Sequence, residues 1–177
     1  PKTKKDLKIG IIGSGLMGHG IAYVSAISGM EVVMADISQL QLDNGLGKIK
    51  KILNDSLIKG FITKKEVNKA LSNINATVDY SSLNECDLII EAVYENRELK
   101  AEVIAKTEKY LNSDGILASN TSTILISRLA ENAIKPEKFI GIHFFSPVHK
   151  MKLVEIIKGK KTNSKTLDQS VEFVTQI

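Results

Sequence analysis

The sequence is poor in residues that several protein classes require. Cys86 is the single cysteine among 177 residues, so no disulfide can form within one chain. A chain without disulfides suits a reducing compartment, and we expect a cytoplasmic location. Cys86 precedes an apolar run, and its simplest interpretation is a small, half-buried residue.

The sequence also lacks long apolar runs and aromatic platforms. No run approaches the ~20 apolar residues of a membrane span, and glycines interrupt the apolar stretch that follows the basic N-terminus. We therefore expect neither a membrane partner nor a signal peptide. Tryptophan is absent, and the net charge of +4 comes from lysines scattered among acids. Nucleic-acid binding would require a concentrated basic face with aromatic residues, so a phosphate-bearing small molecule is the better expectation.

What the sequence does contain is typical of one ordinary globular domain. Hydrophobic residues make up 43% and charged residues 25% of the chain. The length fits about one domain of ~100–200 residues, large enough for a core without disulfides or a structural metal. We find no internal repeat and expect no metal site.

Strand-like and helix-like segments alternate along the chain. This alternation predicts an α/β fold of Rossmann type, doubly wound, with a mostly parallel sheet and helices on both faces. Strands are expected at 7–13, 31–36, 87–93, 115–120, 138–145 and 151–159. Helices are expected at 16–29, 97–111 and 123–132, with a helical arm from 38 to about 73 that Gly60 interrupts, and a last helix within 164–177.

A glycine-rich loop joins the first strand to the first helix. Its residues are Gly13, Ser14, Gly15, Leu16, Met17 and Gly18. The spacing G-x-G-x-x-G in this context predicts a dinucleotide site. Gly13 permits the tight turn, Gly15 lets a pyrophosphate approach the backbone, and Gly18 lets the helix pack closely. The helix N-terminus favours the phosphates.

Asp36 indicates which dinucleotide binds. It ends the second strand eighteen residues after Gly18, where a carboxylate accepts hydrogen bonds from the adenosine ribose. No arginine, which an NADP site would want, stands there or just after, so NAD is the expected cofactor. The alternative is that Asp36 only caps the next helix. His19 either helps to bind phosphate or simply packs.

Four motifs in unbroken order resemble the NAD-binding domain of the L-3-hydroxyacyl-CoA dehydrogenases. They are "GSGLMGHGIA", "EAVYENRELK", "ASNTSTI" and "HFFSPVHKMKLVEI". The resemblance extends over residues 1–177. The sequence is especially similar to the dehydrogenase part of multifunctional fatty-acid oxidation proteins. It implies a helical C-terminal domain for substrate binding and dimerisation downstream. The last helix-like segment has no partner after it, as such a missing domain would explain.

The resemblance places a catalytic dyad on His143 and Glu155. A neutral histidine suits the removal of a hydroxyl proton at physiological pH. A buried carboxylate against its other ring nitrogen would fix the tautomer, and two antiparallel runs joined by a short turn could bring the pair together. The alternative is a core histidine and a surface acid.

Other family positions carry over by the same resemblance. Asn120 lies near the nicotinamide ribose and Ser122 binds the substrate oxygen, although Ser122 or Thr123 could instead cap the next helix. Glu95 and Lys100 line the cofactor region, or else form a solvated helix start.

Two further features concern the substrate. Ser146 stands where stand-alone relatives usually have asparagine, and its hydroxyl could assist the developing carbonyl oxygen. The arm is implied to hold coenzyme A, with Lys48 and Lys51 as candidates, or its lysines form a solvated face. The lysines of this segment are Lys48, Lys50, Lys51, Lys59, Lys64 and Lys65.

The expected activity is the NAD-dependent oxidation of L-3-hydroxyacyl-CoA to 3-ketoacyl-CoA in fatty-acid β-oxidation. The partner is therefore an acyl-CoA, and the intact protein is expected to be a homo-oligomer or part of a multifunctional chain. The alternatives are a 3-hydroxybutyryl-CoA dehydrogenase of fermentative or polymer metabolism, and a non-catalytic NAD-binding relative. Residues 1–177 alone are expected to be poorly active.

Overall fold

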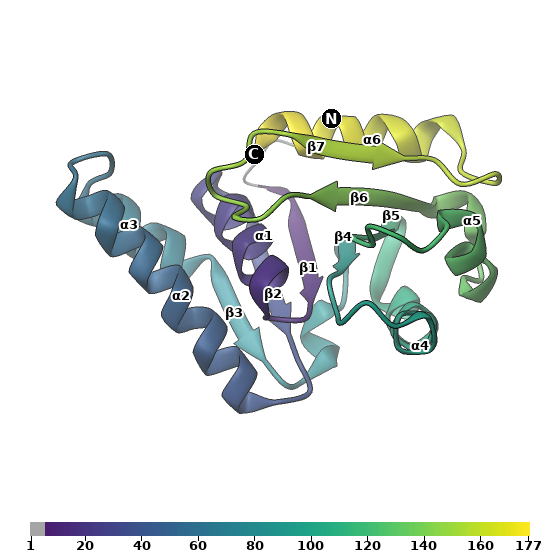
Figure 1. Ribbon diagram of the computed structural model, residues 1–177, viewed down its shortest axis with the longest axis horizontal. Helices are drawn as coiled ribbons and strands as arrows, with labels where there is room; N and C mark the ends of the chain where they lie inside the picture. The colour runs from purple at the N-terminus through teal and green to yellow at the C-terminus, as the bar shows by residue number, and fades with distance from the viewer. Residues whose placement is uncertain (1–5) are drawn as a thin grey trace.

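A seven-stranded sheet forms the centre of the molecule (Figure 1), in a computed structural model that describes residues 6–177. The strand order is β3-β2-β1-β4-β5-β6-β7, and every neighbouring pair is parallel except β6 and β7. The strands are β1 (Lys8–Ile12), β2 (Glu31–Ala35), β3 (Ile74–Thr77), β4 (Cys86–Glu91), β5 (Leu111–Ser119), β6 (Phe139–Phe144) and β7 (Val154–Ile157). The expected Rossmann-type α/β fold is confirmed. Part of the basic N-terminal segment lies outside the described residues.

Helices cover both faces of the sheet, because the buried strands have apolar side chains on both sides. The helices are α1 (Leu16–Ile27), α2 (Gln39–Ile58), α3 (Lys64–Ser72), α4 (Arg97–Thr107), α5 (Ile126–Leu129) and α6 (Ser164–Gln176). One core joins α1, α2, α3 and α6 to one face, and a second joins α4 and α5 to the other. Among these helices none is both long and apolar enough to cross a bilayer.

The helical arm consists of α2 and α3, and it projects from the sheet in Figure 1. The arm breaks into two helices around Gly60, as the sequence predicted. Gly60 has a φ of +73°, which favours glycine. Thr63 begins the second helix with a capping box that it forms with Glu66. Strand β3 was not predicted from the sequence. It is only four residues long, and no strong apolar alternation marks it.

The loops that carry the candidate functional residues lie at the carboxyl ends of the parallel strands. The chain passes outward in opposite directions from β1, to β2 on one side and to β4 on the other, and this reversal creates a crevice outside the carboxyl ends of the strands. The loops after β1, β2, β4 and β5 therefore converge there. The antiparallel pairing of β6 and β7 places His143 directly opposite Glu155.

Candidate functional site

The glycine loop has a geometry that other residues would not tolerate. Gly13 has a φ of +100°, and a Cβ there would lie 2.8 Å from the Ala92 carbonyl oxygen. A Cβ on Gly18 would lie 1.9 Å from the Gly13 carbonyl oxygen, so the helix packs first against the loop itself. Gly15 differs, because a Cβ there would meet no heavy atom within 4 Å. The backbone at Gly15 therefore opens on free space that a ligand can approach.

Asp36 lies beside this loop, just after β2. Its Oδ2 accepts hydrogen bonds from the Ser14 N–H over 3.0 Å and from the Ser14 hydroxyl over 2.8 Å. Its Oδ1 accepts from the Ser38 N–H over 3.3 Å. A carboxylate offers about four acceptor positions, so Asp36 can also receive hydroxyl groups. The capping of α2 itself comes from the Ser38 side chain, which accepts from Gln41 N–H.

A cavity of about 600 Å³ lies over the loop and reaches Asn120 after β5. Its lining includes the predicted Gly13, Gly15, Leu16, Met17, Asp36, Glu95, Lys100 and Asn120. Tyr80 also lines it and was not predicted. Burial and the charge of Asp36 raise the pKa of Tyr80, as expected for a phenol that shares the cavity with a carboxylate.

These features fit a dinucleotide. The open space at Gly15 and the N-terminal end of α1 suit a pyrophosphate, and the Asp36 carboxylate suits a ribose. The lining contains no arginine to receive a ribose phosphate. The cavity crosses the point between β1 and β4 where doubly wound sheets bind dinucleotides.

His143 and Glu155 contact each other on neighbouring strands. His143 Nδ1 lies 3.2 Å from Glu155 Oε1, and the His143 ring packs against Phe145 with centroids 4.6 Å apart. Carboxylates only accept hydrogen bonds, so Nδ1 is the donor in this contact, and in a neutral ring Nε2 is then the acceptor. The expectation of a buried carboxylate is wrong, because the Glu155 side chain is 51% exposed.

The loop after β5 is held by Thr121, which the sequence analysis did not single out. Its hydroxyl donates to Glu95 and accepts from the Ile124 N–H over 3.0 Å. Neither Ser122 nor Thr123 caps α5, whose N-cap is Leu125 with no side-chain hydrogen bond. The capping alternative is therefore wrong. The Ser122 side chain is left exposed.

Asn120 joins this loop to the strand of the dyad. Its Oδ1 accepts from the Phe144 N–H over 2.8 Å, next to His143. Ser146 is exposed in the loop between β6 and β7. Within residues 6–177 neither Ser122 nor Ser146 forms a hydrogen bond with His143, so a substrate would have to bridge them.

Lys100 has a different environment from that of a solvated helix start. It is 1% exposed, and its ammonium lies 2.6 Å from the carboxylate of Glu91, which is 0% exposed. The solvated alternative is wrong for Lys100, although Glu95 is exposed. Sequence analysis missed Glu91. The signal was an acid at the end of a run typical of a buried strand.

His19 packs against the loop. It is 8% exposed, and its Nδ1 lies 2.7 Å from the Gly15 carbonyl oxygen, to which it donates. Burial is the main cause that lowers the pKa of His19, and the charges of Lys48 and His149 also lower it. Lys48 and Lys51 are exposed on α2, outside the lining of the cavity.

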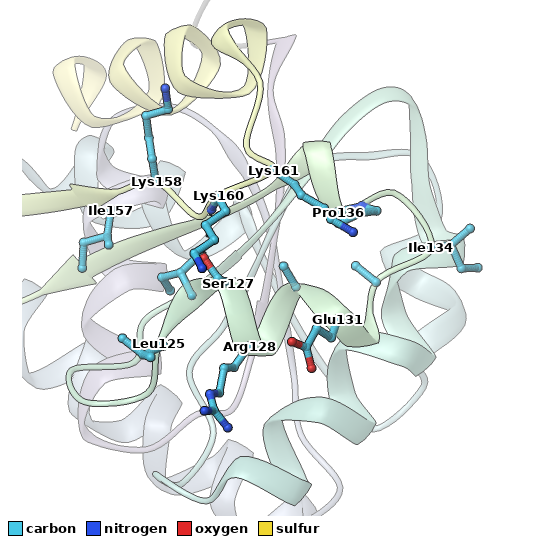
Figure 2. Close-up of a pocket in the computed structure, with 13 residues that line it drawn as sticks. Leu125, Ser127, Arg128, Glu131, Ile134, Pro136, Ile157, Lys158, Lys160 and Lys161 are labelled. Atoms are coloured by element: carbon cyan, nitrogen blue, oxygen red, sulfur yellow. Dashed lines mark hydrogen bonds between the residues drawn. The ribbon is translucent and has the colours of Figure 1, made fainter.

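A second hollow of about 890 Å³ lies elsewhere, between α5 and the segment after β7. It shares no lining residue with the cavity at the glycine loop. Figure 2 shows that its cationic side chains do not converge, since Arg128 and Lys158 point away from each other. The predicted cofactor residues therefore meet in the smaller cavity, whereas His143, Glu155, Ser122 and Ser146 are not among its lining residues.

Known proteins agree with this geometry. Residues 8–177 match the family described as "3-hydroxyacyl-CoA dehydrogenase, NAD binding domain". The fold is similar to (S)-3-hydroxybutyryl-CoA dehydrogenase PaaH1 from Ralstonia eutropha, with 36% identity and a TM-score of 0.92. It is also similar to FadB2 from M. tuberculosis and to 3-hydroxybutyryl-CoA dehydrogenase from Escherichia coli K12, each with 34% identity and a TM-score of 0.92.

These relatives are longer proteins. Each match covers 96% of this chain, but only 60% of the Ralstonia and M. tuberculosis chains and 36% of the Escherichia coli chain. The shared part is the one that holds the glycine loop, Asp36 and the dyad.

Proposed function

Because the chain belongs to the 3-hydroxyacyl-CoA dehydrogenase family, as its NAD-binding domain, we propose that it oxidises L-3-hydroxyacyl-CoA to 3-ketoacyl-CoA reversibly, in fatty-acid β-oxidation. The observation that carries the proposal is the 3.2 Å contact between His143 Nδ1 and Glu155 Oε1. This contact lies at the same sheet edge as the cofactor cavity.

The cofactor is NAD, which when bound would supply the hydride acceptor for oxidation of the carbon that bears the hydroxyl group. Gly13, Gly15 and Gly18, with Leu16 and Met17, would hold its pyrophosphate at the N-terminal end of α1. Asp36 would accept hydrogen bonds from the adenosine ribose. Asn120 and Glu95, together with Lys100, would border the other half of the cavity.

His143 acts as the general base. Its Nδ1–H donates to Glu155, so the lone pair on Nε2 takes the proton of the substrate hydroxyl. Glu155 holds the ring in that tautomer and stabilises the imidazolium that forms. Ser122, together with Ser146, donates a hydrogen bond to the reacting oxygen, whose negative character grows as the proton leaves.

The acyl-CoA extends from this point along the arm. Lys48 and Lys51 are exposed on α2, and lysine ammonium groups suit the phosphates of coenzyme A. This chain spans 60% or less of the length of these relatives, and we propose that residues 1–177 alone turn over poorly.

Replacing the base tests the proposal. In the full-length protein that contains this domain, we expect His143→Ala to lower the rate of acetoacetyl-CoA reduction by NADH more than ~100-fold, the scale of general-base catalysis. His149→Ala is the matched control, because this histidine lies six residues further on and is exposed. A near-normal rate for His143→Ala would end the proposal of a dyad.

A second candidate differs only in the substrate. Two similar structures are 3-hydroxybutyryl-CoA dehydrogenases, which favours a four-carbon acyl group. Rates with acetoacetyl-CoA and with longer 3-ketoacyl-CoA esters separate the two. A sharp fall in kcat/KM beyond four carbons would support the short-chain enzyme.

A further inference from the structure

Two opposite charges lie together in the interior of the domain. Lys100 Nζ donates to Glu91 Oε1 over 2.6 Å and to the Val93 carbonyl over 3.0 Å. The Val93 N–H donates to the same Oε1 over 2.9 Å. Glu91 is 0% exposed and Lys100 1% exposed. Buried charges need such partners, because removal from water is costly.

The other oxygen of Glu91 reaches the next strand. The Ser119 hydroxyl donates to Glu91 Oε2 over 2.6 Å and accepts from the Thr121 N–H over 3.1 Å. The Asn120 N–H donates to the Glu91 backbone carbonyl over 2.9 Å. One buried carboxylate thus connects the loop after β4 with the loop after β5.

Stability alone does not explain these residues. A buried ion pair is often matched or exceeded in stability by apolar residues of similar volume. The backbone groups that Glu91 holds belong to segments that form the site. Val93 and Asn120 line the cavity, and Ser122 follows Thr121 directly.

We propose that Glu91 is a positioning residue, which through Lys100 and Ser119 sets the two loops that present Asn120 and Ser122. The inference rests on the proposed function, since it assigns these loops to the nicotinamide half of the cofactor and to the substrate. The glycine loop and Asp36 hold the adenosine and pyrophosphate half, and among the described residues no side-chain hydrogen bond joins them to Glu91, Lys100 or Ser119. A change in the network therefore affects one half of the cofactor and spares the other.

Ser119→Ala is the cleanest test, because Ser119 is 0% exposed and does not line the cavity. The affinities for NADH and for ADP-ribose, which lacks the nicotinamide, are measured by titration of the chain. We expect NADH affinity to fall about fivefold, because the variant loses the hydroxyl that links Glu91 Oε2 to the Thr121 N–H. We expect ADP-ribose affinity to change less than about twofold, within the effect of an unrelated surface substitution.

A second variant separates positioning from folding. Glu91→Met combined with Lys100→Met replaces the ion pair by side chains of similar size, and we expect it to fold with a lowered unfolding temperature, because the Val93 N–H and the Ser119 hydroxyl lose their acceptor. NADH affinity should still fall by at least about tenfold, because both loops lose their common anchor. The matched control is Glu102→Met with Lys106→Met, an exposed pair on α4 with the same chemistry, which should leave both affinities unchanged.

The outcomes are distinct. Equal NADH affinity in wild type and Ser119→Ala, or an equal loss for NADH and ADP-ribose, overturns the positioning role. Wild-type protein that binds neither ligand contradicts the assignment of the cofactor site instead. A selective loss for NADH in both network variants supports the inference.

Discussion

The contact between His143 and Glu155 joins two residues that water reaches. The His143 side chain is 18% exposed and the Glu155 side chain 51% exposed. A hydrogen bond so open to solvent adds little to stability, since water competes for both groups. We propose that its value to the protein lies in the orientation of the imidazole.

Replacing Glu155 should separate these two effects. In the full-length enzyme we expect Glu155→Gln to lower kcat on the order of 10–100-fold, a part of the 10²–10⁴ that general-base catalysis supplies. The unfolding temperature should change little, because the pair stabilises weakly. Steady-state kinetics and thermal unfolding of the same preparation check both. A large loss of stability with unchanged kcat would contradict the orienting role.

Cys86 gives a residue-scale prediction about pH. Burial raises its pKa from the ordinary value of 9.0 to about 12, and the residue is 0% exposed. The thiol is neutral in the fold, so its contribution to stability is complete below pH 9 and is lost as the pH rises from 9 toward 12. The loss amounts to up to about 4 kcal/mol.

Thiol labelling and unfolding measure this directly. At pH 8 we expect a thiol reagent to modify the native protein at least about 10³-fold more slowly than the protein in denaturant, because the native thiolate is rare. The matched control is Cys86→Ser, whose stability should decline less above pH 9 than that of the wild type. Rapid labelling of the native protein would show that Cys86 is accessible.

At the scale of elements, the glycine loop and α1 contain one glycine that faces the ligand space and one that packs against the fold. The Cβ of Gly15→Ala would enter open space, with a φ of −72° that alanine accepts. We therefore expect unchanged stability and at least about a tenfold loss of NAD affinity, since the methyl group occupies the approach to the backbone.

Gly18→Ala is the contrasting variant. Its Cβ would lie 1.9 Å from the Gly13 carbonyl oxygen, so helix and loop must move apart. We expect a loss of stability of about 1–3 kcal/mol, as for other overpacked sites, measured by denaturant unfolding. If Gly15→Ala destabilised the protein as strongly, the loop would be a packing feature and not a ligand contact.

Some strands and helices could be predicted from the sequence and others could not. The buried strands and the break in the arm could be predicted, because apolar runs and Gly60 are local signals. Strand β3 and the start of α5 could not, since short elements depend on neighbours that are distant in sequence. Strand β7 covers only 154–157 of the expected 151–159, because its pairing with β6 ends at Val154 and Ile157.

At the scale of the whole molecule, the chain spans 60% of the length of two similar proteins and 36% of a third. We expect residues 1–177 to bind NADH in a fluorescence titration and to oxidise 3-hydroxyacyl-CoA slowly or not at all, since we propose that the substrate cleft needs residues outside this chain. Robust turnover by the purified chain would refute this expectation, and the full-length protein is the positive control.

The candidate site was predictable to the extent that its residues carry motifs. Gly13, Gly15, Gly18 and Asp36 stand at spacings whose physical reason is local. The structure brings Gly13, Gly15 and Asp36 to one cavity and packs Gly18 against the loop. Glu91, Ser119 and Thr121 carry no such pattern. Their role depends on the meeting of β4 and β5, which a single sequence does not display.

The sequence by itself determined the order of strands and helices apart from β3, the glycine loop and the acid at the end of β2, because each follows from local sterics and apolar periodicity. The tertiary structure decided which side chains meet. Register placed Glu155 opposite His143 and left the carboxylate half exposed, and parallel pairing of β4 and β5 buried the charges of Glu91 and Lys100 together. Such contacts depend on residues far apart in the chain, and only folding brings them within hydrogen-bonding distance.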